Sequence, residues 1–264
     1  MTEQGLVLAL IALLAGVATA PAHASGGATV PGDPAQTDLA DRASLQRGAK
    51  LFVNYCAGCH SMKLMRTSRI AEDLKLTQAQ VEQNLLFTGA KFGDPLVAAM
   101  SVEASTQWFG KAPPDLSLTG KARGSDWIYN YLRGFYLDPE ARIGWNNTVF
   151  PNASMPNVLW EMQGMQRAVF EPVPKGAHGA AGHCKHGSTE VEGRCFVKFQ
   201  SVAEGSLTGE AFDQSVRDIS AFMEYAAEPA ALKRTRIGAW VILFLAFFTF
   251  LAWLLKMEFW RDVH

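Results

Sequence analysis

The sequence lacks any large imbalance of charge. Its 264 residues include 24 Lys and Arg and 25 Asp and Glu, so the formal net charge is −1. Between Ser25 and Leu232 there are 22 acidic and 19 basic residues, a net of −3. A chain this close to neutral gives no sign of a nucleic-acid partner, and it permits an acidic docking surface without establishing one.

Three familiar patterns are also missing. The chain has no Gly-x-Gly nucleotide loop, no stretch of alternating polar and apolar residues, and no cluster of acid–base or nucleophilic side chains. Without strand alternation, the sequence predicts an all-α domain with long loops. Capping residues and apolar spacings of three and four predict helices that begin after Asp41 and at Thr77, and helices over 125–136, 157–168 and 208–228.

Hydrophobic residues are unevenly placed, with uncharged runs near both ends of the chain. The first run, Leu6 to Ala20, is fifteen residues long, which is short for a membrane span and typical of a signal-peptide core. Ala22-His23-Ala24 follows as a small-x-small cleavage site. We therefore expect a signal peptide over 1–24 and a linker over 25–40. The first five residues contain Glu3 and no Lys or Arg, so an uncleaved N-terminal anchor is the alternative.

The second run, Ile237 to Leu255, has nineteen uncharged residues, and as a helix it is about 28 Å long, enough to cross a bilayer. It predicts a transmembrane anchor over 237–255 and a cytoplasmic tail over 256–264, which leaves 41–232 for a periplasmic domain. A buried core helix is the alternative. Three basic residues precede the run and two follow it, which alone would favour the opposite orientation, but an exporting leader outweighs that count.

The strongest motif is Cys56-Ala57-Gly58-Cys59-His60, a CxxCH pentapeptide at the end of the helix that Asp41 begins. Two thiols at this spacing can each add to a vinyl group of one porphyrin, and the histidine becomes an axial ligand of the iron. A redox dithiol and half of a zinc site are the alternatives. The motif predicts one covalently bound haem c, held by Cys56, Cys59 and His60.

Eight residues before Cys56, Gly48 lies within the same predicted helix. Glycine inside a helix is less stable than alanine by about 1 kcal/mol. A glycine at this position therefore suggests that another element packs too closely for a side chain. We expect a close contact there with the 208–228 helix, in which six apolar residues form one stripe: Phe212, Val216, Ile219, Phe222, Met223 and Ala226.

A methionine thioether is the sixth ligand that keeps an electron-transfer haem at high potential. Of the nine methionines, position in the chain or within a helix argues against all but Met100 and Met155. Met155 lies between Pro151 and Pro156, in a segment that the prolines hold out of a helix. We favour Met155 as the ligand, with Met100 as the alternative.

Pro113 and Pro114 stiffen a second segment, which is followed by Lys121 and Arg123. One interpretation is a turn with a solvated basic pair. The other is a wall at the haem edge, from which the planar guanidinium of Arg123 donates two hydrogen bonds to a haem propionate.

Four motifs in this order resemble the cytochrome c1 family: residues 47–62 around the CxxCH sequence, Pro113-Pro114-Asp115-Leu116-Ser117, the Met155-Pro156 loop, and Tyr225-Ala226-Ala227-Glu228-Pro229 before the membrane span. The resemblance runs from about Leu39 to the C-terminus. Gly48 and Phe52 also stand where class I cytochromes c have a glycine and an aromatic at the crossing of their first and last helices. The resemblance therefore implies a class I cytochrome c-like haem domain.

Cytochrome c1 is the haem subunit of the ubiquinol–cytochrome c reductase (cytochrome bc1) complex, so the resemblance also implies partners. The chain would accept an electron from a Rieske iron–sulfur protein and pass it to a soluble cytochrome c. It would lie beside cytochrome b, within a dimeric complex of a bacterial inner membrane. His60 and Met155 would be the axial ligands, Arg123 the propionate partner, and Pro113 and Trp127 part of the haem pocket.

Three other roles fit parts of the same pattern. One is a stand-alone membrane-anchored cytochrome c, and another is a cytochrome subunit of a periplasmic dehydrogenase or haem-copper oxidase. A thiol oxidoreductase is less favoured, because no thioredoxin-like strand pattern surrounds the CxxC sequence. The chain also lacks the acidic tract of mitochondrial cytochromes c1, which leaves the docking of a soluble partner open.

Cys184 and Cys195 lie eleven residues apart in a loop rich in glycine and histidine. In an exported chain a disulfide is the simplest account of two remaining cysteines, and it would contribute roughly 2–3 kcal/mol to stability. A zinc site built from Cys184, His186 and neighbouring histidines is the alternative, although the spacing fits no standard zinc signature.

Overall fold

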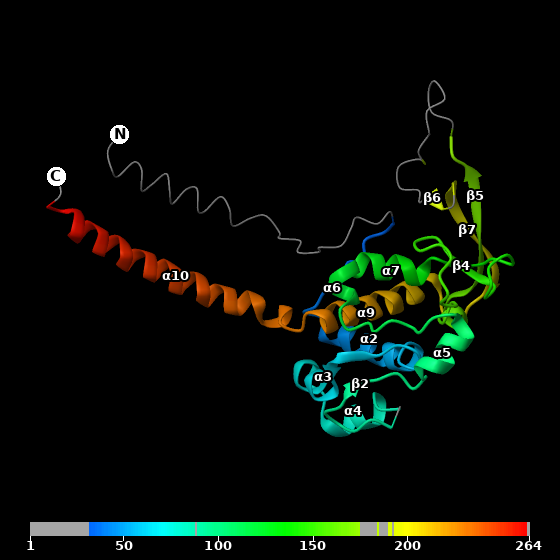
Figure 1. Cartoon of the computed structure of the whole chain (residues 1–264), viewed down its shortest axis with the longest axis horizontal. Helices are drawn as coiled ribbons and strands as arrows, with labels where there is room; N and C mark the ends of the chain where they lie inside the picture. Colours follow the sequence, from blue (N-terminus) through cyan, green and yellow to red (C-terminus); the bar gives the residue numbers. More distant parts are fainter. Residues whose placement is uncertain (1–31, 88, 175–183, 185–189, 192, 263–264) are drawn as a thin grey trace.

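The computed structural model describes residues 32–87, 89–174, 184, 190–191 and 193–262. The expected signal peptide over 1–24, the first part of the expected linker, and His186 lie outside these residues. The described chain forms a mainly helical domain from which one long helix projects (Figure 1).

The centre of the domain is a pair of crossed helices, α2 (Arg42–Tyr55) and α9 (Gly209–Ala227). Asp41 caps α2 by accepting a hydrogen bond from the Ser44 amide at 3.1 Å, and Thr208 caps α9 by accepting one from the Ala211 amide at 3.3 Å. Both predicted helices are confirmed. All six residues of the predicted apolar stripe on α9 are buried.

Gly48 is the point where the two helices come closest. A Cβ atom added there would lie 2.0 Å from the main-chain oxygen of Asp218 and 2.8 Å from the Cβ of Phe222. One helical turn along, the rings of Phe52 and Phe222 pack with centroids 5.7 Å apart. The structure thus supplies the packing reason expected for a glycine inside this helix.

Polar bonds reinforce the crossing. The buried carboxylate of Asp218 accepts hydrogen bonds from the Ser44 hydroxyl at 2.6 Å, from Arg47 Nε at 2.6 Å and from Gln214 Nε2 at 2.9 Å. The bond to this carboxylate, opposed by partial burial, raises the pKa of Arg47. Because a buried carboxylate is costly unless it is fully bonded, this set of partners fixes how α2 and α9 meet.

The remaining helices of the domain are short, and α6 and α7 pack on α9. A Cβ at Gly120 in α6 would lie 2.3 Å from the main-chain oxygen of Met223, so this contact is also one of main chain against main chain. The capping box predicted at Thr77 is present and opens α4. The bounds are α3 (Thr67–Leu74), α4 (Gln78–Asn84), α5 (Val102–Phe109), α6 (Thr119–Arg123), α7 (Ser125–Arg133) and α8 (Trp160–Gln163).

The predicted all-α fold is confirmed only in part, because the described residues also form three small antiparallel sheets. Strands β1 (Met62–Arg66) and β2 (Pro95–Leu96) form one pair, and β3 (Phe135–Leu137) and β4 (Trp145–Asn147) form another. The third sheet has the order β5-β7-β6, with strands β5 (Gly164–Pro172), β7 (Arg194–Glu204) and β6 (Glu190–Val191).

The helix predicted over 157–168 is reduced to the four residues of α8, followed by β5. Gly164 ends it with a φ of +88°, and a Cβ there would lie 2.3 Å from the main-chain oxygen of Ala203. Register shifts after Met165 and Val169 interrupt the pairing of β5 with β7. Each such bulge breaks the two-residue alternation, which is why the strand leaves no clear pattern in the sequence.

The long β5–β7 hairpin extends away from the helices of the domain (Figure 1). Aromatic side chains pack along it. Ring centroids of Tyr136 and Phe170 lie 5.7 Å apart, and those of Phe170 and Phe196 lie 6.2 Å apart. Cys184 and Cys195 are joined as a disulfide, with their Cα atoms 5.4 Å apart.

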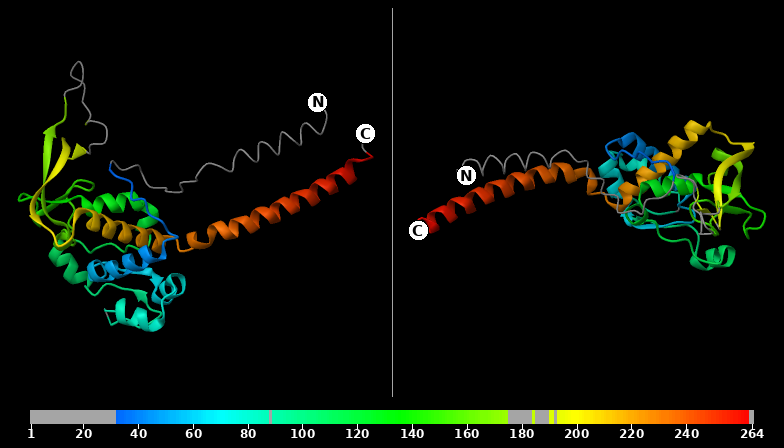
Figure 2. Two further views of the ribbon diagram at one scale, coloured as in Figure 1. Left: turned by 180° about the vertical axis from the view of Figure 1, so that it is seen from behind. Right: turned by 90° about the horizontal axis from the view of Figure 1, so that it is seen from above.

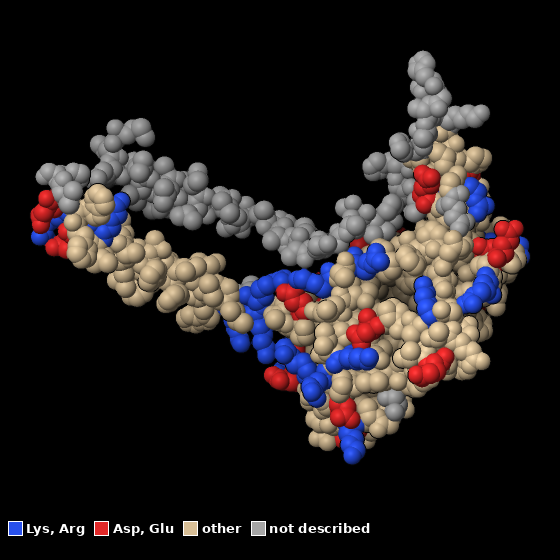
Figure 3. Space-filling model, in the orientation of Figure 1, with Lys and Arg blue, Asp and Glu red and all other residues tan. Residues whose placement is uncertain are grey.

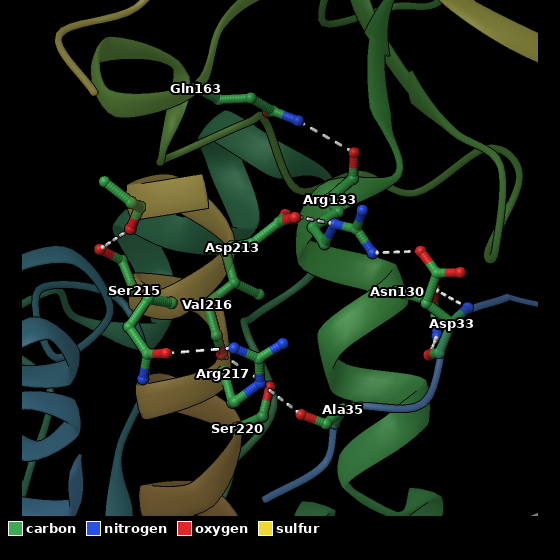
Figure 4. Close-up of polar contacts among 12 residues, drawn as sticks. Asp33, Ala35, Asn130, Arg133, Gln163, Asp213, Ser215, Val216, Arg217 and Ser220 are labelled. Atoms are coloured by element: carbon green, nitrogen blue, oxygen red, sulfur yellow. Dashed lines mark hydrogen bonds and ion pairs between the residues drawn. The ribbon is translucent and has the colours of Figure 1, made fainter. Parts of the chain in front are cut away.

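The last part of the expected linker packs against α7 and α9 (Figure 4). Arg133 Nη1 donates to Asp33 Oδ2 at 3.0 Å, and Arg217 Nε donates to the Ala35 carbonyl at 2.7 Å. Ala35 itself is fully buried. These residues form neither helix nor strand, as the lack of periodicity predicts, yet their backbone is held by specific bonds.

Helix α10 (Ala231–Trp260) extends away from the domain (Figure 2). Its segment Arg236–Trp260 has a mean hydropathy of 2.3 and none of it is buried against the described part of the chain, so by length and composition it can cross a membrane. Glu228, in the short connection from α9, accepts hydrogen bonds from Lys121 at 2.5 Å and Arg234 at 3.0 Å.

We predict that Gly48→Ala destabilises the protein although alanine is the better helix former. Overpacking against main chain costs about 1–3 kcal/mol, which exceeds the gain of about 1 kcal/mol in helix propensity. Denaturant unfolding of the purified protein, followed by circular dichroism, measures the difference. Gly209→Ala is the matched control, because a Cβ on that residue of α9 meets nothing within 4 Å. Equal stability of the two variants would contradict a close crossing at Gly48.

Candidate functional site

A cleft of about 580 Å³ opens beside the C-terminal end of α2. Its walls come from that helix end, from the segment after α5 and from the loop before α8, and they are mostly apolar. The lining residues are Tyr55, Cys56, Cys59, His60, Phe109, Lys111, Ala112, Pro113, Pro114, Ser154, Met155, Pro156 and Val158.

The CxxCH sequence forms a tight turn that continues from α2. The amide of Cys56 still donates to the Phe52 carbonyl at 2.8 Å, and the amides of Cys59 and His60 donate back to the Cys56 carbonyl at 3.0 and 2.8 Å. Both thiols are free of any disulfide, and Cys56 is buried. Helix α2 therefore delivers both cysteines and the histidine to one cleft.

The environment of the two thiols does not suit redox exchange. Burial, with a smaller effect of Cys59, raises the pKa of Cys56 to about 12, and burial also raises the pKa of Cys59. A thiol oxidoreductase needs a thiolate with a lowered pKa. The structure therefore argues against the redox-dithiol interpretation of this motif.

The orientation of His60 is set by the Pro114 carbonyl, which lies 2.8 Å from Nδ1. A carbonyl oxygen can only accept, so Nδ1 carries the hydrogen and Nε2 keeps its lone pair. Burial lowers the pKa of His60, although the Pro114 bond and the nearby Asp115 carboxylate oppose the shift. A neutral imidazole with a free Nε2 is the form that binds a metal.

The segment from Pro113 to Ser117 is fixed to the residues that follow His60. Leu116 donates its amide to the Ser61 carbonyl at 2.8 Å, and Asp115 accepts from the Lys63 amide at 2.9 Å. Partial burial opposes ionisation of Asp115, but hydrogen bonds from Ser117 and from the Lys63 amide outweigh it and lower the pKa. The two prolines therefore form a rigid wall of the cleft.

Of the two candidate methionines, Met155 lines the cleft and Met100 is not among the lining residues. The Met100 amide instead donates to the Gly58 carbonyl at 3.0 Å. The structure therefore brings Met155 together with Cys56, Cys59 and His60.

Two buried asparagines, which were not predicted from the sequence, position the loop that carries Met155. Asn147 Oδ1 accepts from the Val149 and Phe150 amides at 2.8 and 3.1 Å, while Asn146 Oδ1 accepts from the Asn152 amide at 2.8 Å. Asparagine side chains commonly bond nearby main chain in turns. An Asn-Asn pair just before a proline-rich segment was the available signal.

Tyr131 is a second residue that the sequence analysis missed. Its hydroxyl donates to Met155 Sδ at 3.5 Å, and its ring stacks on Trp127 with centroids 4.8 Å apart. Burial raises the pKa of Tyr131 to about 12, so the phenol keeps its proton and remains a donor. The four-residue spacing from Trp127 puts both rings on one face of α7, but no sequence signal links that face to Met155.

Arg123 and Trp127, expected in the haem pocket, are not among the residues that line the cleft. The Arg123 guanidinium lies over the Trp127 ring, 5.1 Å from its centroid. Trp127 lies behind the Met155 loop, where it stacks on Tyr131 and meets the edge of Phe150 with ring centroids 6.5 Å apart. Pro113, the third expected wall residue, does line it.

The cleft fits a haem in its chemistry. Its lining side chains are mostly apolar, and such walls suit a hydrophobic macrocycle. Two free thiols, an imidazole with Nε2 available and a thioether supply the donor set of covalent attachment and axial ligation.

These features define a class of protein. A helix that ends in a buried CxxCH turn, a methionine in the same apolar cleft and a helix able to cross a membrane are together typical of membrane-anchored c-type cytochromes.

Comparison with known proteins gives the family. The sequence profile described as the Cytochrome C1 family matches residues 35–168 and 200–263. Cytochrome c1 of Allochromatium vinosum is 47% identical over 98% of this chain and 99% of its own length. A Nitrosomonas europaea protein named ammonia monooxygenase gamma subunit is 40% identical over 96% of this chain and 97% of its own length, and cytochrome c1 of Rhodospirillum rubrum is 28% identical over 84% and 83%.

The chain therefore belongs to the cytochrome c1 family, the haem subunit of the cytochrome bc1 complex. Membership of that oxidoreductase complex implies cytochrome b and a Rieske protein as partners, and a role as an electron carrier. The roles of stand-alone cytochrome and of dehydrogenase or oxidase subunit are not favoured.

Proposed function

We propose that this chain holds one haem c, bonded covalently through Cys56 and Cys59, with His60 Nε2 and Met155 Sδ as the axial ligands. The observation that supports this proposal is the convergence of these four side chains in one apolar cleft. When bound, the haem supplies one-electron chemistry at its iron. The residues of the chain orient the ligands and keep water away from them.

In this proposal the electron comes from the Rieske protein and leaves to a soluble cytochrome c. The cleft has the composition that such a relay needs, because His60 and Met155 provide the strong ligands and apolar side chains provide a low-dielectric surrounding. No step requires proton transfer by a side chain. A dimeric complex is part of the same proposal and rests on family membership.

We also propose that the domain faces the periplasm and that the C-terminal tail lies in the cytoplasm. A disulfide between Cys184 and Cys195 fits an oxidising compartment. Of the three basic residues before the span, Lys233 lies 3.7 Å from Glu72, and Arg234 bonds Glu228. These two side chains form ion pairs with the domain, which accounts for their presence on the periplasmic side of the span.

We expect Met155→Leu to abolish the weak red absorption band of iron–sulfur ligation in the oxidised protein. Leucine keeps the volume of the side chain but has no donor atom. The visible spectrum of the purified, oxidised variant is the measurement. Met100→Leu is the matched control and should retain the band. If Met100→Leu removes the band and Met155→Leu keeps it, the assignment of the ligand is wrong.

Tyr131→Phe should lower the reduction potential of the haem by about 20–40 mV, the equivalent of roughly 0.5–1 kcal/mol for one hydrogen bond. The hydroxyl bond withdraws electron density from Met155 Sδ and so favours the reduced iron. Potentiometric titration measures the shift. Tyr129→Phe, two residues earlier on α7, is the control, because that ring packs against Arg133 and Arg217 rather than in the cleft. Equal potentials for both variants would rule out this effect of Tyr131.

The assignment to a complex is tested by purification from native membranes in mild detergent through a tag on this chain. We expect b-type haem and an iron–sulfur protein to copurify with a c-type haem present at one per chain. Pyridine haemochrome spectra and the electron paramagnetic resonance signal of the iron–sulfur centre measure the two haem types and the cluster. Purification with c-type haem alone would contradict the assignment to a complex, but it would not contradict the proposed haem site.

A further inference from the structure

A second cavity, of about 650 Å³, lies where the domain meets helix α10, and it shares no lining residue with the haem cleft. Three basic side chains line it: Arg42 at the start of α2, Lys75 at the end of α3 and Lys233 in the first turn of α10. Its other walls include Leu39, Leu74 and Leu232. The carboxylates of Glu72 and Asp73 also line it, so the cavity combines apolar walls with three cationic and two anionic side chains.

The position of the cavity corresponds to the head-group layer of a bilayer. Lys233 precedes the first residue of the span, Arg236, by three residues, or about 4.5 Å along the helix axis. The polar layer on each side of the hydrocarbon core is about 5–8 Å thick. A molecule in this cavity therefore lies at the depth of lipid phosphates.

The charges around the cavity are not balanced within the chain. Arg42 and Lys75 are exposed, and neither forms an ion pair with another residue in the part of the chain that the structure describes. Lys233 lies between two carboxylates, at 3.7 Å from Glu72 and 3.9 Å from Asp73, and the latter also accepts from Arg69. Figure 3 shows basic side chains gathered where α10 leaves the domain.

Two further carboxylates, which precede Arg42 in the sequence, are bonded to main chain. Asp38 accepts from the Ala40 amide at 2.8 Å, and Asp41 caps α2. Lys75 is also held in the left-handed region, with a φ of +59°, where a residue other than glycine is uncommon. Arg42 and Lys75 are thus two cations beside the cavity that have no ion-pair partner among the described residues.

From these observations we propose that the cavity binds the phosphate head group of an anionic glycerophospholipid, with Arg42 and Lys75 as its ligands and the leucines beside its glycerol and first acyl carbons. Arginine suits this role because its planar guanidinium can bond two phosphate oxygens at once. The proposal rests on the proposed anchoring of the chain by α10. Such a lipid would couple the domain to the membrane at a site separate from electron transfer.

The test is native mass spectrometry of the full-length protein in detergent, titrated with phosphatidylglycerol or with phosphatidylcholine of the same acyl chains. We expect the wild-type protein to favour phosphatidylglycerol. Each basic residue near an anionic lipid contributes about a fivefold gain in affinity, so the double variant R42Q/K75Q should bind phosphatidylglycerol about 30-fold more weakly. Binding of phosphatidylcholine should not change.

The matched control is R167Q/K198Q, which removes one exposed arginine and one exposed lysine from the β5–β7 hairpin. It should bind phosphatidylglycerol as the wild-type protein does, and the circular dichroism melting curves of both double variants should match the wild-type curve. Equal affinity of R42Q/K75Q and the control for phosphatidylglycerol would overturn the proposal.

Three further outcomes would also overturn the lipid site. One is equal wild-type affinity for the two lipids, and another is displacement of phosphatidylglycerol by inorganic phosphate at the same concentration. The third is loss of copurifying cytochrome b from R42Q/K75Q with lipid binding unchanged, which would make the surface a protein interface. Failure of the anchor itself is distinguished separately, because a chain without a span would not insert into lipid vesicles.

Discussion

The close approach of α2 and α9 at Gly48 is the constraint on which the rest of the molecule depends. Main chain lies against main chain there, and the buried carboxylate of Asp218 ties the two helices with bonds from both. The C-terminal end of α2 becomes the CxxCH turn, while α9 leads through a short connection into the membrane helix. One crossing therefore fixes the cofactor motif relative to the membrane anchor.

The features that were predicted correctly from the sequence are those that depend on interactions between residues close together in the chain. Caps at Asp41 and Thr77 act within one helical turn, so the helices that they begin were found with correct starts, and the apolar stripe of α9 located the third helix. The sheets were missed because their pairing is long-range and their alternation is broken by bulges. Gly164 illustrates the limit, since its positive φ and its contact with Ala203 follow from a strand that returns some forty residues later.

The candidate site divides in the same way. The CxxCH turn is a local motif and needed no structure to be recognised. Met155 was predicted as a ligand from the sequence mainly by excluding other methionines. In the structure it lines the same cleft as the CxxCH motif. Tyr131 could not be predicted, because its role depends on a contact across 24 residues that no pattern encodes. Arg123 was proposed from its guanidinium chemistry and from family resemblance, and Trp127 from resemblance alone. The structure places both outside the lining of the cleft, with Trp127 packed against Tyr131 and Phe150.

The connection between α9 and α10 has a mechanical consequence. Only three residues separate the two helices, and one of them, Glu228, is bonded both to Lys121 of the domain and to Arg234 of α10. The short connection and these bonds couple the orientation of the domain to that of its span. Because a transmembrane helix tilts to match the thickness of its bilayer, a thinner membrane inclines the whole domain. Bilayer thickness thus sets the height above the membrane at which partners must meet the cleft.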